Sequence, residues 1–123
     1  MARRKKTETV VYTDGAGNNG KNKKSPNGYP GGWSWVAVKN DKIIDVDAGY
    51  SMATTSNNME MEAIMRAKVK YGKKTIITDY KTATRKFRNV RWQRRGTTKW
   101  NKLADALASI SMKKAEIIKF SRV

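Results

Sequence analysis

One stretch of the sequence reads Val10-Val11-Tyr12-Thr13-Asp14-Gly15-Ala16-Gly17. Its β-branched and aromatic residues favour a strand, and the glycines that follow the aspartate allow the chain to turn sharply. An aspartate at the end of a strand adds little to core packing, but it is well placed to hold a metal ion where a ligand approaches closely. A hairpin with an Asp-Gly turn is the alternative for this stretch taken alone. The acidic residues further along the chain decide between the two.

The composition excludes several kinds of active site. The 123 residues include no cysteine and no histidine. Disulfides, thiolate or imidazole metal sites, cysteine nucleophiles and serine–histidine triads are therefore excluded. A chain of this length predicts one domain, which we place at residues 8–123. Residues 1–7 are expected to form a disordered basic arm, which either lies along phosphates or is a solvated tail.

The charge predicts a polyanionic partner. There are 27 Lys and Arg against 10 Asp and Glu, giving a net charge of +17. Nucleic acid is the first candidate, and an extracellular heparin-type polyanion is the alternative. No apolar run approaches the roughly 18 residues of a membrane span, and the N-terminus has no apolar signal segment. We expect a soluble, cytoplasmic monomer without a membrane partner.

The first half of the chain predicts three antiparallel strands. The hydrophobic pattern places them at residues 8–14, 33–38 and 42–50. A long turn rich in Gly, Asn and Lys joins the first two, and Asn40-Asp41 joins the second and third. In the second strand, Trp33 and Trp35 alternate with polar and aliphatic residues, so both rings are expected in the core rather than on a binding surface.

The second half predicts helices and parallel strands. In order, the expected elements are a helix at 54–70, a strand at 74–79, a short basic crossover at 80–89, a strand at 90–93 and a helix at 97–111. Leu103, Leu107 and Ile110 form the expected apolar face of the last helix, and residues 115–123 look extended. This order predicts an α/β fold, a mixed sheet with helices on its faces.

Four acidic residues stand out by position: Asp14, Glu60, Asp79 and Asp105. Asp14 and Asp79 each end a strand, so parallel pairing of the two strands would bring both carboxylates to one edge of the sheet. Glu60 has a structural alternative as a capping-box partner of Asn57, and Asp105 has one as a solvated helix position. Together, four carboxylates without histidine or cysteine make an all-oxygen site suited to Mg²⁺ or Mn²⁺.

Each acid lies in a recognisable block of sequence. The blocks are Thr13-Asp14-Gly15-Ala16-Gly17, Gly31-Gly32-Trp33-Ser34-Trp35, Thr54-Thr55-Ser56-Asn57-Asn58-Met59-Glu60-Met61, Ile77-Thr78-Asp79 and Asn101-x-x-x-Asp105-x-Leu107-Ala108. In this order they resemble type 1 ribonuclease H over most of residues 8–111. The resemblance implies a five-stranded mixed sheet, in which a three-stranded antiparallel meander continues into parallel strands, with flanking helices. It also assigns the four acids to the family's metal-binding tetrad.

The resemblance implies hydrolysis of the RNA strand of RNA–DNA hybrids to 5′-phosphate and 3′-hydroxyl ends. Two Mg²⁺ ions, replaceable by Mn²⁺, would be held by the tetrad, with Asp14 bridging both. Backbone groups of 15–17 and the Asn57 side chain are candidates for sensing 2′-hydroxyls, and Thr55 for a phosphate of the DNA strand. The full set of candidate nucleic-acid contacts is Gly15, Ala16, Gly17, Asn18, Thr55, Ser56, Asn57, Arg94, Arg95, Lys99, Trp100 and Asn101.

Two segments depart from the family pattern. Residues 80–89 replace several helices, which in some members include a basic protrusion. Residues 94–100 replace a loop whose histidine assists metal and product traffic, so its absence affects turnover more than chemistry. Ser56 stands where the family often has asparagine.

Basic residues are concentrated around the shortened crossover: Lys81, Arg85, Lys86, Arg88, Arg91, Arg94, Arg95, Lys99 and Lys102. We interpret them as a compact replacement for the protrusion that grips phosphates, and a generally solvated basic surface is the alternative. Trp100, at a helix start in a basic loop, is the aromatic residue expected to contact nucleic acid.

Three functions remain open from the sequence. The first is a hybrid-specific endoribonuclease. The second is a nuclease of the same superfamily that acts on branched DNA or double-stranded RNA. The third is a non-catalytic nucleic-acid-binding module, against which the four acids argue because polyanion binding gains nothing from clustered carboxylates.

Overall fold

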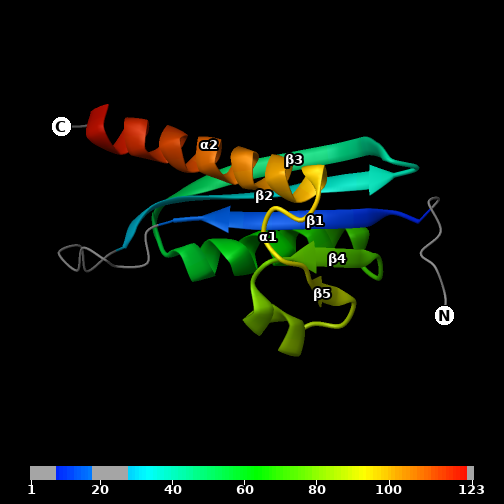
Figure 1. Cartoon of the computed structure of the whole chain (residues 1–123). Helices are drawn as coiled ribbons and strands as arrows, with labels where there is room; N and C mark the ends of the chain where they lie inside the picture. The colour runs from blue at the N-terminus through cyan, green and yellow to red at the C-terminus, as the bar shows by residue number, and fades with distance from the viewer. Residues whose placement is uncertain (1–7, 18–27, 122–123) are drawn as a thin grey trace.

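The computed structural model describes residues 8–17 and 28–121 (Figure 1). The basic arm expected at residues 1–7, the candidate contact Asn18 and most of the first long turn lie outside the described residues. Within the described ranges, no helix has both the length and the apolar character that crossing a membrane requires.

A mixed five-stranded sheet forms the centre of the molecule. Its strands are β1 (Val10–Ala16), β2 (Tyr29–Lys39), β3 (Lys42–Thr54), β4 (Thr75–Thr78) and β5 (Val90–Trp92). They are ordered β3-β2-β1-β4-β5 across the sheet. β1, β2 and β3 pair antiparallel, whereas β4 pairs parallel with β1 and β5 parallel with β4. The predicted meander followed by parallel strands is confirmed.

Two helices cover opposite faces of this sheet (Figure 1). α1 (Ser56–Tyr71) packs on the face that carries Trp33 and Trp35, and α2 (Lys99–Ser121) packs on the face that carries Val36 and Val38. Alternate residues of β2 therefore pack into two cores, one on each face of the sheet, and both tryptophans are buried as expected. Residues 79–89 connect β4 to β5, and they contain one short 3₁₀ helix, η1 (Lys81–Arg85).

Three sequence-based boundaries are wrong. β2 begins at Tyr29, inside the expected turn, and β3 continues to Thr54. Residues 115–121 are helical rather than extended, because α2 continues without a break and buries Ala115 in the same row as Ala104 and Ala108. The helix end that was predicted near residue 111 is not followed by a proline or glycine in the sequence.

Leu103 and Leu107 of α2 pack against the core as predicted, but the fully buried residues of this helix are small. Ile110, expected on the same face, is 63% exposed. A Cβ at Gly32 would lie 2.2 Å from the Ala108 carbonyl oxygen, so the helix backbone rests directly on β2. Such close packing needs glycine and alanine at the contact and leaves no room for a large side chain.

Candidate metal centre

Two of the four predicted acids meet at one edge of the sheet. β1 and β4 are parallel neighbours, and Tyr12 lies opposite Ile77. The same register continued by two residues brings Asp14 beside Asp79, which directly follows β4. The sequence predicts that Asp14 and Asp79 meet if their strands pair in parallel, and β1 and β4 do pair in parallel.

Glu60 reaches the same edge from α1. The cap of this helix is Thr55, whose Oγ1 accepts a hydrogen bond from the Asn58 backbone N–H at 3.1 Å. The capping-box alternative for Glu60 is wrong, since Glu60 Oε1 accepts from the backbone N–H of Gly15 at 2.5 Å. Gly15 makes this approach possible, because a Cβ there would lie 2.3 Å from the Glu60 nitrogen. A contact between β1 and α1 thus aims Glu60 at Asp14.

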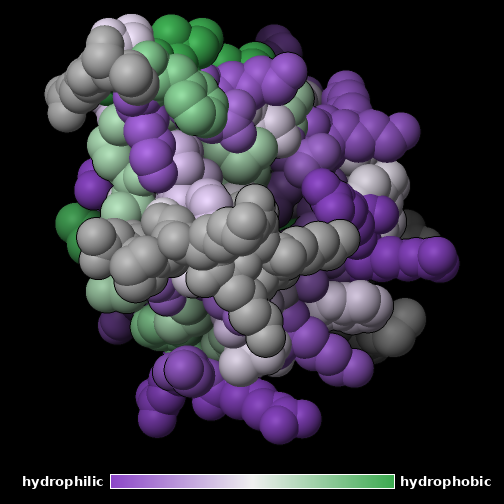
Figure 2. Space-filling view, turned by 90° about the vertical axis from the view of Figure 1, so that its left-hand side faces the viewer, coloured by the Kyte–Doolittle hydropathy of each residue, from purple (hydrophilic) through white to green (hydrophobic). Residues whose placement is uncertain are grey.

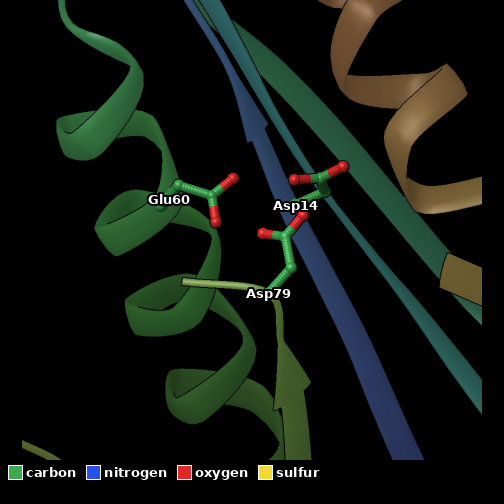
Figure 3. Close-up of side chains that lie close together, drawn as sticks. All are labelled: Asp14, Glu60 and Asp79. Atoms are coloured by element: carbon green, nitrogen blue, oxygen red, sulfur yellow. The ribbon is translucent and has the colours of Figure 1, made fainter. Parts of the chain in front are cut away.

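The three carboxylates form a compact cluster (Figure 3). Asp14, Glu60 and Asp79 each offer one oxygen, and these oxygens lie within 4.8 Å of one another. Asp14 is 5% exposed and Glu60 6% exposed, and Glu60 Oε2 is a buried acceptor without a hydrogen-bond partner. A buried, unpartnered carboxylate oxygen beside two others fits a hard divalent cation, which favours oxygen ligands.

Burial makes it costly for this cluster to be fully ionised without a cation. It raises the pKa of Asp14 to about 7, an effect that the neighbouring Glu60 carboxyl opposes and the charge of Asp79 reinforces. The pKa of Glu60 is raised further, first by burial and then by the adjacent Asp14. The metal-free site therefore holds protons at neutral pH, and a divalent cation would replace them.

Asp105 lies outside this group of three. Its Oδ1 accepts an ion-pair hydrogen bond from Nη2 of Arg95 at 2.9 Å. Asp105 nevertheless contributes to the raised pKa of Asp14, so it stands close to the cluster. The charges of Asp105, Asp14 and Asp79 all raise the pKa of Arg95, with Asp105 the main cause. The structure thus brings together three of the four predicted acids and places a guanidinium on the fourth.

A cleft of about 660 Å³ opens over the carboxylates. Six of the predicted nucleic-acid contacts line it: Gly15, Ala16, Gly17, Ser56, Asn57 and Arg95. Four lining residues were not predicted: Tyr80, Trp92, Ser109 and Met112. Ser109 could have been found, since it lies four residues after Asp105 on the same helix face. Trp92 becomes recognisable only from the pairing of β5 with β4.

Other predicted nucleic-acid contacts either support the fold or are exposed outside the cleft. Asn101 Oδ1 accepts from the Thr98 N–H at 3.0 Å and caps α2. Trp100 packs against the core on the α2 face, with Lys99 Nζ 4.5 Å from its ring centroid. The side chain of Arg94 is exposed. The expectation that Trp100 contacts nucleic acid stays a prediction, although much of its surface is used by the core.

All nine basic residues expected to grip phosphates are exposed. Figure 2 views the molecule from the end where β1 and β4 stop. It shows hydrophilic side chains gathered along the right and lower sides, and hydrophobic ones near the top, where Figure 1 places the end of α2. Hydrophilic and hydrophobic side chains are therefore separated on this end of the molecule.

The sheet order, the two covering helices and the carboxylates at the ends of two parallel strands define a class of α/β protein with an acidic site at the sheet edge. The family model described as RNase H matches residues 6–123. The chain belongs to the RNase H family.

Curated relatives agree with this assignment. Ribonuclease H of Rickettsia typhi is 36% identical over 74 residues, a match that covers 60% of this chain and 43% of the relative. Ribonuclease H of Treponema denticola is 38% identical over 66 residues, covering 50% of this chain and 37% of the relative. The chain thus spans less than half the length of the curated relatives it matches.

Solved structures share the fold. The N-terminal RNase H domain of a Mycobacterium tuberculosis protein is 17% identical, with a TM-score of 0.69, and the match covers 92% of this chain and 99% of that one. LC11-RNase H1, solved in complex with an RNA/DNA hybrid, is 19% identical with a TM-score of 0.64, covering 88% and 99%. At these identities the likeness concerns the fold.

Proposed function

We propose that this protein is a metal-dependent endoribonuclease that hydrolyses the RNA strand of RNA–DNA hybrids to 5′-phosphate and 3′-hydroxyl ends. The observation that carries the proposal is the convergence of Asp14, Glu60 and Asp79 within 4.8 Å, with a buried and unpartnered Glu60 oxygen. A chain of net charge +17 has no evident use for such a cluster except to hold cations. Membership of the RNase H family directs the proposal to hybrids.

In this proposal, Asp14, Glu60, Asp79 and Asp105 hold two Mg²⁺ ions, which Mn²⁺ can replace. When bound, the metal supplies an activated water and stabilises the leaving 3′ oxygen. The chain's own residues prepare the site. The Gly15 N–H fixes Glu60, and Asp14 and Glu60 give up their protons. Arg95 occupies Oδ1 of Asp105, which leaves the other carboxylate oxygen as a possible ligand atom.

The cleft supplies the contacts that would select a hybrid. Asn57 and the backbone of residues 15–17 line it beside the carboxylates, where they can meet 2′-hydroxyls of an RNA strand. The exposed basic residues around η1 and the loop before α2 can neutralise phosphates of either strand. Recognition and chemistry would thus be supplied by different residues.

The test is a cleavage assay on four substrates of matched sequence: an RNA–DNA hybrid, double-stranded RNA, double-stranded DNA and a four-way DNA junction. We expect cleavage of the hybrid alone, in its RNA strand, and only with Mg²⁺ or Mn²⁺. Cleavage restricted to the junction or to double-stranded RNA would replace the proposal with another nuclease activity. Tight hybrid binding without cleavage of any substrate would make the protein a binding module.

A further inference from the structure

One aromatic ring in the cleft is not used for packing. Trp92 is 49% exposed, whereas Trp33 and Trp35 are 4% and 3% exposed in the core. Trp100 packs against the second core cluster. Of the four tryptophans, Trp92 alone lines the cleft over the carboxylates. Its exposed surface in the cleft is therefore available for stacking with a ligand.

The sheet holds Trp92 firmly at the catalytic edge. It lies opposite Thr78 in the parallel β4–β5 pair, and the next residue, Gln93, donates its N–H to the Thr78 carbonyl at 2.8 Å. Asp79 directly follows Thr78. The ring is therefore one strand away from a predicted metal ligand, at the end of an edge strand that pairs with β4.

A cation already lies over this ring. Lys81 Nζ is 5.5 Å from the centroid of Trp92, and Lys81 is the first residue of η1. An exposed contact between a cation and an aromatic ring favours the contacting state about 2- to 5-fold. Stacking of a nucleic-acid base on an aromatic ring strengthens binding of the nucleic acid about 5- to 100-fold. A base would therefore displace the ammonium, which would then be free to pair with a phosphate.

We propose that Trp92 and Lys81 form a nucleotide-binding subsite beside the carboxylates. The indole stacks on a base near the cleaved bond, and the ammonium of Lys81 contacts a phosphate of the same strand. The identity of the substrate as an RNA–DNA hybrid rests on the proposed function. The subsite itself requires only that a nucleic acid binds in the cleft. The shortened crossover makes the subsite possible, because only Tyr80 separates Asp79 from Lys81, the first residue of η1.

The experiment measures binding of a labelled RNA–DNA hybrid by fluorescence anisotropy in EDTA, which prevents cleavage, over a series of salt concentrations. Trp92→Ala should weaken binding about 5- to 100-fold and leave the salt slope unchanged, because stacking releases no counterions. Trp92→Phe should restore most of the affinity. Trp92→Leu, which keeps apolar area but lacks a flat ring, should not.

Lys81→Ala should behave differently. It should weaken binding and reduce the slope of log K against log salt by about 1, as expected for one lost phosphate contact. Lys114 and Tyr50 provide a matched control, because Lys114 Nζ lies 5.7 Å from the Tyr50 centroid and neither residue lines the cleft. Lys114→Ala and Tyr50→Ala should each leave the affinity within about twofold of the parent.

The outcomes separate this proposal from the broader one. If Trp92→Ala melts like the parent and binds the hybrid equally well, or if Trp92→Leu binds as well as Trp92→Phe, the subsite is wrong. A parent that binds hybrid but cleaves none with Mg²⁺ would overturn the nuclease, while a loss of binding in Trp92→Ala would still support the subsite. Cleavage by the parent together with unchanged binding by Trp92→Ala would overturn the subsite alone.

Discussion

At the scale of single residues, the buried pair of Asp14 and Glu60 has the largest consequence. Burial makes the charged form of each carboxyl unfavourable. Their position is explained by a ligand that repays this cost. A divalent cation would do so, and the unpartnered Glu60 Oε2 is an acceptor available to it.

This pair predicts how the stability of the metal-free protein depends on pH. The folded-state pKa of Asp14 is raised from 3.8 to about 7, and that of Glu60 is raised from 4.5. Groups with raised pKa values stabilise the fold fully below their unfolded pKa, and this contribution disappears as pH rises through the folded value. We expect the free energy of unfolding in EDTA to fall by on the order of 1–3 kcal/mol between pH 5 and pH 8.

Thermal or urea unfolding at pH 5, 6.5 and 8, with EDTA or with Mg²⁺, measures this. Mg²⁺ should raise Tm more at pH 8 than at pH 5, and Asp14→Asn should remove much of the pH dependence. Asp45, whose pKa is lowered by Lys70, is ionised across this range and does not confuse the comparison. Equal Mg²⁺ effects at both pH values would contradict the linkage between protons and metal.

Arg95 and Arg94 provide a second prediction at this scale. Both side chains are exposed, but Arg95 lines the cleft and pairs with Asp105, whereas Arg94 does not line the cleft. We expect Arg95→Ala to raise the KM for hybrid about tenfold, and Arg94→Ala about two- to threefold, with smaller changes in kcat. Steady-state kinetics at fixed salt measures both. Equal effects of the two variants would mean that Arg95 acts only as surface charge.

At the scale of elements, the site depends on how closely α1 approaches β1. A Cβ at Gly15 would lie 2.3 Å from the Glu60 nitrogen and 2.4 Å from the Met59 carbonyl carbon, so Gly15→Ala must push the start of α1 away. We expect it to destabilise the protein by about 1–3 kcal/mol and to abolish most Mg²⁺-dependent cleavage. Unfolding and cleavage should be measured on the same preparation.

Gly72→Ala is the matched control for this prediction. Gly72 ends the same helix at φ +48° with nothing within 4 Å of a Cβ. Its replacement should cost stability through backbone strain, by about 1 kcal/mol, and leave cleavage near the parent rate. If Gly15→Ala loses stability but keeps its activity, Glu60 does not depend on this contact.

Elements were predictable from the sequence where local pattern decides them. The alternating residues of β2 and the end of α1 at Gly72 depend on neighbours in the chain, whereas β1 continues to Ala16, two residues beyond the end predicted at Asp14. The start of β2 was not predictable, because Gly31 and Gly32 look like turn residues until a helix packs on them. The extent of α2 was missed for the related reason that its buried face is made of small residues.

The candidate site was predictable in its acids but not in its contacts. Asp14 and Asp79 follow from strand ends, whereas the role of Glu60 required a neighbour 45 residues away, the N–H of Gly15. The Arg95–Asp105 ion pair joins a loop to a helix, and the exposure of Trp92 depends on strand pairing. Such contacts between distant segments leave no periodic signal in one sequence.

At the scale of the whole molecule, positive charge should control substrate binding. If about six phosphates are neutralised, log K for a hybrid should fall against log salt with a slope of about −5. Anisotropy titrations between 50 and 300 mM salt measure the slope. A slope near zero would mean that the charge of +17 serves something other than contact with phosphates.

The most direct test of the central claim is cleavage of a hybrid labelled on both strands, with Mg²⁺ or with EDTA, by the parent and by Asp79→Asn. The parent with Mg²⁺ should cut the RNA strand alone. EDTA or Asp79→Asn should lower the rate by at least about 1,000-fold, while Tm stays at or above that of the parent. Cleavage by Asp79→Asn near the parent rate, or equal cleavage in EDTA, would contradict a metal centre built on these carboxylates.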